Sequence, residues 1–319
     1  MTSRLGRCFA AVLFALTAAC AFAQQRPVRV LVGLAPGGAV EMVSRLYADK
    51  LRAALGQPVI VENRVGASGL IAMDALRAAP ADGSVLLFAP NGGITLVSQT
   101  FRNPRFDPFK DVVPVAMVAL VDIVLVVNAA LNAKSVADFL ALARSEARYR
   151  NFGSAPGTIP HLAAALFADA AGIDALYVPY KGAGQAIIDV LGGQLQASVV
   201  TSGDALPLHR AGKVRLLATF GAQRSPLMPD IPTMKESGFP LEVSGWFGFY
   251  APAGTPAPTV ERIGRALLEA SRAPDVRERL AAVGMEAAGR LSQEVSIIMR
   301  SDYETWRRAI KIAGLQPQD

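Results

Sequence analysis

The chain has 319 residues, of which 52% are hydrophobic and 18% are charged, and its formal net charge is +6. This composition excludes a disordered protein, and the length predicts two compact lobes or one large α/β unit. The basic residues stand singly among acidic ones, whereas a nucleic-acid-binding surface needs clustered positive charge. We therefore expect a folded protein that does not bind nucleic acid.

Residues 1–23 have the pattern of a secretory signal peptide. Arg4 and Arg7 provide the basic start, residues 9–19 the apolar stretch, and residues 21–23 a small-residue cleavage site. Cleavage there would release an exported chain that begins at the next residue.

Both cysteines, Cys8 and Cys20, fall inside this leader, and a lipid anchor on Cys20 is an open alternative. Without the leader the chain has no thiol, which excludes disulfides, cysteine catalysis and cysteine-ligated metals. The two histidines, His161 and His209, have no carboxylates at metal-ligand spacing. We therefore expect neither a metal nor a cofactor.

After the leader, apolar runs alternate with amphipathic segments. Residues 28–34 are apolar throughout, as in a strand covered on both faces, and residues 35–40 form a Gly/Pro turn before a helix over residues 41–55. Gly56 can end that helix in the left-handed conformation, and residues 58–61 begin the next strand.

The alternation continues along the chain. Further strands are expected over residues 85–89, 177–180, 195–200 and 214–220, and helices over residues 70–78, from 135, from 161 and over 185–191. Ser135 and Asp138 have the spacing of a weak capping box. Because parallel neighbours need a crossover connection, this order predicts an α/β fold with mostly parallel sheets.

Residues 112–131 are apolar over about the length of a membrane span. They contain Asp122, Pro114 and Asn128, however, and their Val and Ile content favours extended chain. We predict two buried strands here.

The last part of the sequence is helical. Thr255 is expected to cap a helix that has Pro256 at its first position, and Pro274 to start a second helix. Residues 292–313 predict a third helix, with Trp306 on its buried apolar face.

Five loops follow predicted strands, where α/β sheets bind their ligands. Each could be a simple turn, but together their backbone amides and hydroxyls predict a cleft that holds a carboxylate without arginine. A dinucleotide site is excluded because the G-x-G-x-x-G fingerprint is absent. The loops are residues 35–41, 91–93, 154–158, 181–184 and 201–204.

The sequence offers little for catalysis, since the usual hydrolase and nucleotide motifs are missing. Ser154 and His161 could act as nucleophile and base, but a turn and a first helical turn explain them better. An exported hydrolase stays the weaker alternative, and we expect a protein that is not an enzyme.

In order along the chain, several segments resemble the periplasmic substrate-binding receptors of tripartite tricarboxylate transporters, the Bug receptors. They include VRVLVGLAPGGAVE, LGQPVIVENRVGASG, APADGSVLLFAPNGG, YRNFGSAPGT, VPYKGAG, HRAGKVRLLAT and GWFGFYAPAGTP. The resemblance implies a two-lobed, type II-like binding-protein fold with a strand hinge and C-terminal helices. It implies one lobe from residues 24–124 and 247–319 and another from residues 125–246.

The resemblance also implies a ligand site between the lobes. By position, that site takes Pro36, Gly37, Gly38, Ala39, Val40, Glu41, Asn91, Gly92, Ser154, Ala155, Thr158, Lys181, Thr201 and Ser202. Val40 and Glu41 stand where the family commonly has Thr and Asp, and Val200 where many relatives have Asp. Glu41 could face solvent or select a cationic group. The ligand therefore cannot be carried over from the family.

The sequence thus predicts a monomeric periplasmic receptor that captures a small organic carboxylate and delivers it to the membrane subunits of a tripartite tricarboxylate transporter. An exported sensory module that signals ligand occupancy is the alternative. Replacing Gly38 by Val is expected to abolish binding, because the branched side chain would fill space next to the ligand.

Overall fold

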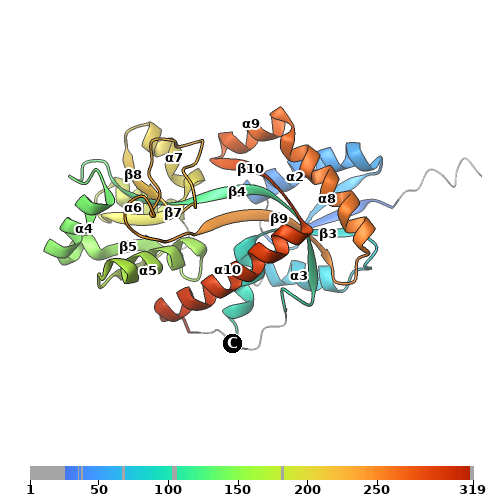
Figure 1. Cartoon of the computed structure of the whole chain (residues 1–319), viewed down its shortest axis with the longest axis horizontal. Helices are drawn as coiled ribbons and strands as arrows, with labels where there is room; N and C mark the ends of the chain where they lie inside the picture. Colours follow the sequence, from blue (N-terminus) through green and yellow to red (C-terminus); the bar gives the residue numbers. More distant parts are fainter. Residues whose placement is uncertain are drawn as a thin grey trace, which may run out of the picture.

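A computed structural model describes residues 26–34, 36, 39–66, 69–102, 106–180 and 183–316. The predicted leader, Gly37, Gly38 and Lys181 lie outside these residues. The structure has two halves, each built of helices and strands, which the long strands β4 and β9 join (Figure 1). A ten-stranded sheet runs through both halves in the order β2-β1-β3-β9-β4-β7-β5-β6, and β8 and β10 also pair with β4. The α/β class is confirmed.

In the first half, three parallel strands follow the expected alternation of strand and helix. Strand β1 pairs with both β2 and β3, and its residues Val30 and Val32 are fully buried. The elements are β1 (Val28–Val32), α2 (Ala39–Leu55), β2 (Val59–Asn63), α3 (Leu70–Arg77), β3 (Val85–Pro90) and the short helices η2 (Gly92–Leu96) and η3 (Val97–Gln99).

In the second half, β5 pairs in parallel with β6 and β7. Ser135 caps α4, and its side chain and that of Asp138 form the expected capping box. The elements are α4 (Val136–Ser145), η4 (Ala147–Arg150), β5 (Asn151–Ser154), α5 (Ile159–Ala171), β6 (Leu176–Pro179), α6 (Ala183–Leu191), β7 (Ala197–Thr201), α7 (Ser202–Arg210) and β8 (Val214–Thr219).

The prediction of two strands over residues 112–131 was wrong, because β4 (Val112–Asn128) is one continuous strand. Up to Asp122 it pairs antiparallel with β9 (Ser244–Pro252), and from Ile123 onward with β7 and β8. Register shifts in these pairings let the strand change partners without ending. The sheet is therefore mixed and not mostly parallel as expected, with antiparallel pairs at its centre and parallel pairs toward its edges. No helix in the described ranges is long and apolar enough to span a membrane.

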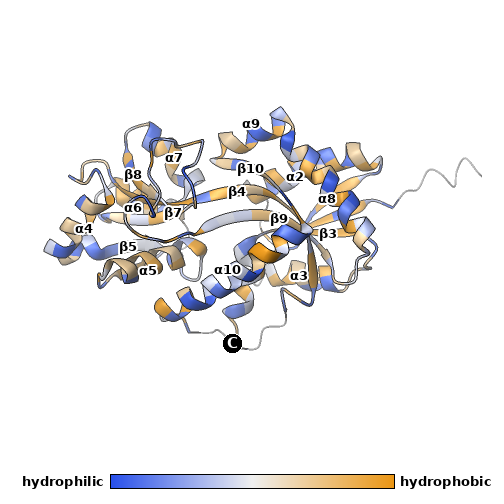
Figure 2. Ribbon diagram, viewed as in Figure 1, coloured by the Kyte–Doolittle hydropathy of each residue, from blue (hydrophilic) through white to orange (hydrophobic). Residues whose placement is uncertain are grey.

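The C-terminal segment contains α8 (Ala257–Arg272), α9 (Pro274–Ala282), β10 (Met285–Leu291) and α10 (Ser292–Ile312). The predicted cap at Thr255 was wrong by one residue: Pro256, in extended conformation, precedes α8, and the Thr255 hydroxyl donates to the Pro252 carbonyl at 2.7 Å. Hydrophilic and hydrophobic stretches alternate along α8 and α10 (Figure 2), as expected for helices with one buried face.

Helix α10 packs against both halves. Val295 and Met299, near its start, join the core around Trp246, whereas Trp306 and Ala309 join the core around α5. Trp306 is therefore a core residue, as the sequence predicted. This helix and the strands β4 and β9 are among the elements that link the two halves.

A partly buried carboxyl group lies where β4 changes partners. Asp122 is the last residue of β4 that pairs with β9, and Ser225 and Glu286 are its polar neighbours. Burial raises the pKa of the Asp122 carboxyl to about 6, with the Ser225 hydrogen bond opposing that rise and the Glu286 charge adding to it. Since the folded pKa exceeds the unfolded value of about 4, ionisation costs folding free energy as the pH rises from 4 to above 6.

We expect Asp122→Asn to stabilise the protein at pH 7.5 by about 3 kcal/mol, or about 5 °C in Tm. The gain should fall to about 0.5 kcal/mol near pH 4, where Asp122 is protonated in the folded state and about half ionised in the unfolded state. Thermal unfolding followed by circular dichroism at the two pH values measures this difference. The exposed Asp174→Asn serves as control, and a gain that does not depend on pH would contradict the interpretation.

Candidate functional site

A cleft of about 650 Å³ lies between the two halves, at the carboxyl ends of β3, β5 and β7. This is the edge at which α/β sheets bind ligands, and the volume suits a small molecule. Its lining residues are Leu34, Pro90, Asn91, Gly92, Gly93, Leu96, Val97, Thr100, Phe101, Val121, Ile123, Pro156, Gly157, Thr158, Ile159, Pro160, Thr201, Gly245, Trp246 and Phe247.

The strands that join the halves contribute Val121 and Ile123 from β4 and residues 245–247 from β9 to this lining. Gly245 is required there, because a Cβ atom would come within 2.5 Å of Val121 Cγ1. A close approach of the two strands therefore shapes this part of the cleft.

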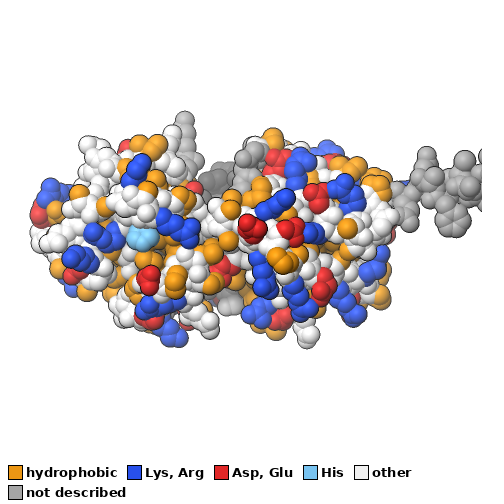
Figure 3. All heavy atoms as spheres, turned by 90° about the horizontal axis from the view of Figure 1, so that it is seen from above, with side chains coloured by type: hydrophobic (Ala, Val, Ile, Leu, Met, Phe, Trp, Pro, Cys, Tyr) orange, Lys and Arg blue, Asp and Glu red, His pale blue; other side chains and the backbone are white. Residues whose placement is uncertain are grey.

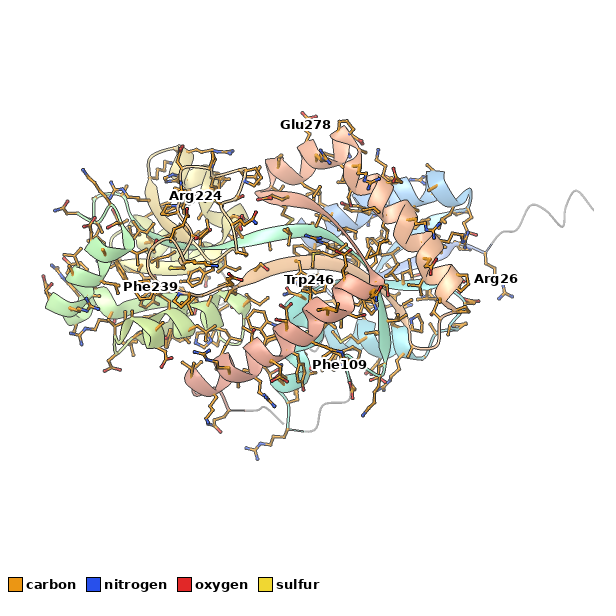
Figure 4. All side chains as sticks on the ribbon, in the orientation of Figure 1. Arg26, Phe109, Arg224, Phe239, Trp246 and Glu278 are labelled. Carbon is orange, nitrogen blue, oxygen red and sulfur yellow. The ribbon has the colours of Figure 1, made fainter. Side chains whose placement is uncertain are left out.

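The partly buried carboxylate of Asp302, on α10, organises the β3–η2 side of the cleft. Its Oδ2 accepts hydrogen bonds from Asn91 Nδ2 at 2.9 Å and from Trp246 Nε1 at 2.8 Å. Asn91 also accepts from the Trp246 backbone N–H at 3.2 Å and donates to the Ser244 carbonyl at 3.3 Å. Figure 4 shows Trp246 in the middle of the molecule, close to α10. The Asn91 amide is thus used to join η2, β9 and α10.

Burial raises the pKa of Asp302, while the donors Asn91 and Trp246 oppose that rise. Helix α10 makes two further bonds to the same side of the cleft. Trp306 Nε1 donates to Thr95 Oγ1 at 3.1 Å, and Gln99 Nε2 donates to the Tyr303 carbonyl at 3.0 Å. The segment that carries Gly92 and Val97 is therefore held by α10.

The opposite side of the cleft is the start of α5. The N–H of Gly157 donates to His161 Nδ1 at 3.2 Å, and burial lowers the pKa of His161, which favours the neutral ring that can accept this bond. The first N–H of α5 that bonds back to the loop is that of Leu162. The preceding amides of Ile159 and His161 therefore form the positive end of the helix, where an anion is stabilised.

Thr201 lines the cleft at the end of β7, and its hydroxyl donates to Asp204 Oδ2 at 2.5 Å. The next residue, Ser202, is fully buried, and its hydroxyl donates to the Gly284 carbonyl at 2.7 Å. Gly203 and Gly284 lie in backbone contact there, since a Cβ on Gly284 would come within 2.7 Å of Gly203 Cα. Ser202 thus fastens α7 to the turn before β10.

Of the residues implied by the resemblance, Asn91, Gly92, Thr158 and Thr201 line this cleft. Val40 lines a separate hollow of about 30 Å³ next to Gly93. Glu41 is buried in the first turn of α2, where its Oε1 accepts from Arg45 Nη2 at 2.6 Å.

The other implied residues are placed as follows. Pro36 is exposed, Ala39 begins α2, and Ala155 is partly buried before α5. Ser154 is only 3% exposed, and its hydroxyl has no hydrogen-bond partner in the described part of the chain. Gly37, Gly38 and Lys181 lie outside that part. The assignment of these residues to the ligand site stays a prediction.

Sequence reasoning missed the apolar residues Leu96, Val97 and Phe101 and the strand residues Trp246 and Phe247. Trp246 and Phe247 belong to the segment GWFGFYAPAGTP, which was used only for the family resemblance. The first three follow the Asn-Gly-Gly motif, but its continuation into a short helix was not predicted.

Ser154 and His161, the pair considered as nucleophile and base of a hydrolase, are not hydrogen-bonded to each other in the described structure. His161 accepts from the Gly157 amide, and no hydrogen bond between it and Ser154 is found within the described ranges. No group of three or more His, Cys, Asp or Glu residues that could hold a metal ion occurs among the residues described.

Residues 43–315 match the model of the family described as "Tripartite tricarboxylate transporter family receptor". Protein BugT of Bordetella pertussis is 32% identical, over 91% of this chain and 90% of BugT. Rpa4515 of R. palustris, solved with adipate, is 31% identical, with a TM-score of 0.78 over 92% of this chain and 99% of that one. MatC of Rhodopseudomonas palustris, solved with bound malate, is 29% identical, with a TM-score of 0.73 over 89% and 99% of the two chains.

Removing the Asp302 carboxylate should loosen the β3–η2 side of the cleft. Asp302→Ala leaves the buried donors of Asn91 and Trp246 without an acceptor, so we expect a loss of about 1–3 kcal/mol in the free energy of unfolding. Asp302→Asn keeps one acceptor oxygen and should lose less. Urea denaturation measures both variants, and equal stability of Asp302→Ala and the wild type would refute the role assigned to this carboxylate.

Proposed function

The chain belongs to the tripartite tricarboxylate transporter receptor family, and we propose that it is a periplasmic solute-binding receptor that delivers a small organic carboxylate to such a transporter. The observation that carries the proposal is the cleft between the two halves, with the start of α5 on one side. That start supplies the amides of Ile159 and His161, for which the described residues provide no partner and which can hold a carboxylate without a cationic side chain.

The relatives support the choice of ligand class. Two proteins of similar sequence and fold carry adipate and malate in their structures, and both ligands are carboxylates. The proposal includes the two predicted lobes: residues 24–124 together with 247–319 form one, and residues 125–246 form the other. It also retains export by the leader, a monomeric state and no cofactor.

Capture requires that the ligand bind a closed arrangement of the halves better than an open one. The residues that line the cleft come from both halves, so a ligand between Gly92 and Thr158 would contact both. Strands β4 and β9 are the continuous connections about which such a closure would bend, and Asn91 and Trp246 would carry the change to α10.

Calorimetric titration of the chain without its leader, refolded after unfolding to remove bound ligand, tests this function. We expect saturable binding of one class among mono-, di- and tricarboxylates and no binding of matched neutral amides. Failure of every carboxylate to bind would overturn the proposal. Uptake of that ligand by vesicles that hold the transporter's membrane subunits should require the protein, whereas a sensory module would leave uptake unchanged.

Two buried serines provide a matched test of the site. The Ser154 hydroxyl has no partner among the residues that the structure describes, whereas the Ser198 hydroxyl donates to the Gly153 carbonyl at 2.6 Å. If Ser154 donates to the ligand, Ser154→Ala should weaken binding about 2- to 10-fold without lowering Tm. Ser198→Ala should lower Tm and leave affinity unchanged. Wild-type affinity in Ser154→Ala would remove this residue from the site.

A further inference from the structure

The loop after β8 contacts β10 across the boundary between the two halves (Figure 1). Met285, at the start of β10, packs in the core of the first half with Val30, whereas the loop continues from β8 of the second half. In this loop, the buried hydroxyl of Ser225 donates to Glu286 Oε1 of β10. A movement of one half against the other therefore acts on this hydrogen bond.

Asp122 lies beside this bond, at the point where β4 changes partners. Ser225 is also hydrogen-bonded to Asp122, and the charge of Glu286 acts on the same carboxyl group. A Cβ atom on Gly221, in the loop, would lie 3.0 Å from Asp122 Oδ1. Polar side chains from β4, from β10 and from the loop thus meet where the halves are joined.

Glu286 is the charged group that acts on Asp122 among the described residues. The register partner of Asp122 on β9 is Ser244, which is uncharged. From β8, the Thr219 hydroxyl lies 3.8 Å from the same Cβ position of Gly221. The surroundings of Asp122 therefore consist of hydroxyl groups and a second carboxylate.

The cation of the loop, Arg224, is bonded within the second half. Its Nε donates to the two carboxylate oxygens of Glu236 at 3.0 and 2.9 Å, and its Nη1 donates to the Pro229 carbonyl at 3.1 Å. Figure 4 shows Arg224 in the upper part of that half. Glu236 therefore balances the charge of Arg224.

The Ser225 hydroxyl has one proton for two carboxylates. Its oxygen accepts from the Leu227 N–H at 3.3 Å, and its proton is donated to Glu286. The bond between Asp122 and Ser225 is then made when Asp122 itself carries a proton and donates it. In agreement, burial raises the pKa of Asp122 to about 6, and the neighbouring charge of Glu286 adds to the rise.

We propose that closure of the two halves over a ligand traps a proton at Asp122, so that the affinity for the ligand rises as the pH falls. The proposal rests on the proposed function and adds proton uptake to it. When the halves separate, Ser225 leaves and water reaches the Asp122 carboxyl, whose pKa returns toward its ordinary value of about 4. The closed form thus binds more protons than the open form between pH 4 and 6, and a ligand of the closed form gains affinity there.

Calorimetric titration of the wild type and of Asp122→Asn at pH 7.5 and 5.0 tests this proposal. The probe is whichever of butanoate, adipate, malate and citrate binds most tightly at pH 7.5. Relative to Asp122→Asn, which is neutral at every pH, the wild type should gain about tenfold in affinity at the lower pH. The comparison cancels the titration of the probe itself. The exposed Asp174→Asn is the matched control and should behave as the wild type.

Two further measurements locate the proton. Titration in buffers with different heats of ionisation should show uptake of about 0.7 proton per ligand at pH 5.5 in the wild type, in excess of Asp122→Asn. Glu286→Gln removes the neighbouring charge, so the rise in affinity should move to lower pH.

The same pH dependence of affinity in the wild type and in Asp122→Asn would overturn the proposal while the proposed function stands. If Asp122→Asn does not fold, proton uptake by the wild type beyond the known titration of the probe decides, and its absence would overturn the proposal as well. If no carboxylate binds, the proposed function and this proposal both fail.

Discussion

The cleft depends on the hydrogen bonds that the partly buried carboxylate of Asp302 accepts. It accepts from Asn91 at the end of β3 and from Trp246 on β9, and it is itself carried by α10. Three segments that are far apart in the sequence thus meet at one oxygen atom. Because an ionised carboxylate is costly to bury without partners, the two donors and the acceptor require one another. Asn91, which the resemblance implies as a ligand contact, also holds this part of the cleft in place.

The second constraint is that β4 belongs to both halves. Its partners change from β9 to β7 and β8 within two residues, so a bend at Asp122 would turn one half against the other. Helix α10 also contacts both halves, through Met299 on one side and Trp306 on the other. Any closure over a ligand must therefore keep both contacts of α10 or exchange one of them.

On the face drawn in Figure 3, basic and acidic side chains are interspersed. Our proposal of ligand capture accordingly relies on the local field at the start of α5 and not on attraction by the whole surface.

Much of the fold could be predicted because buried strands and amphipathic helices leave a periodic pattern, as in β1, α2 and α10. Elements whose partners lie far away in the sequence were missed or divided: β10 pairs with β4, and β4 was expected to be two strands. Of the site, the loops after β3, β5 and β7 were located, and Gly92, Thr158 and Thr201 line the cleft. Which donors remain for a ligand could not be predicted, because Thr201 and Asn91 are engaged by partners that only the folded chain brings near them.

The location of the ligand is tested most directly by tryptophan fluorescence, because the chain has two tryptophans and Trp246 alone lines the cleft. In Trp306→Phe, titration with a carboxylate whose affinity is known from calorimetry should change the Trp246 emission and saturate at the calorimetric Kd. A ligand that binds by calorimetry and leaves the emission of Trp246 unchanged would contradict binding in this cleft.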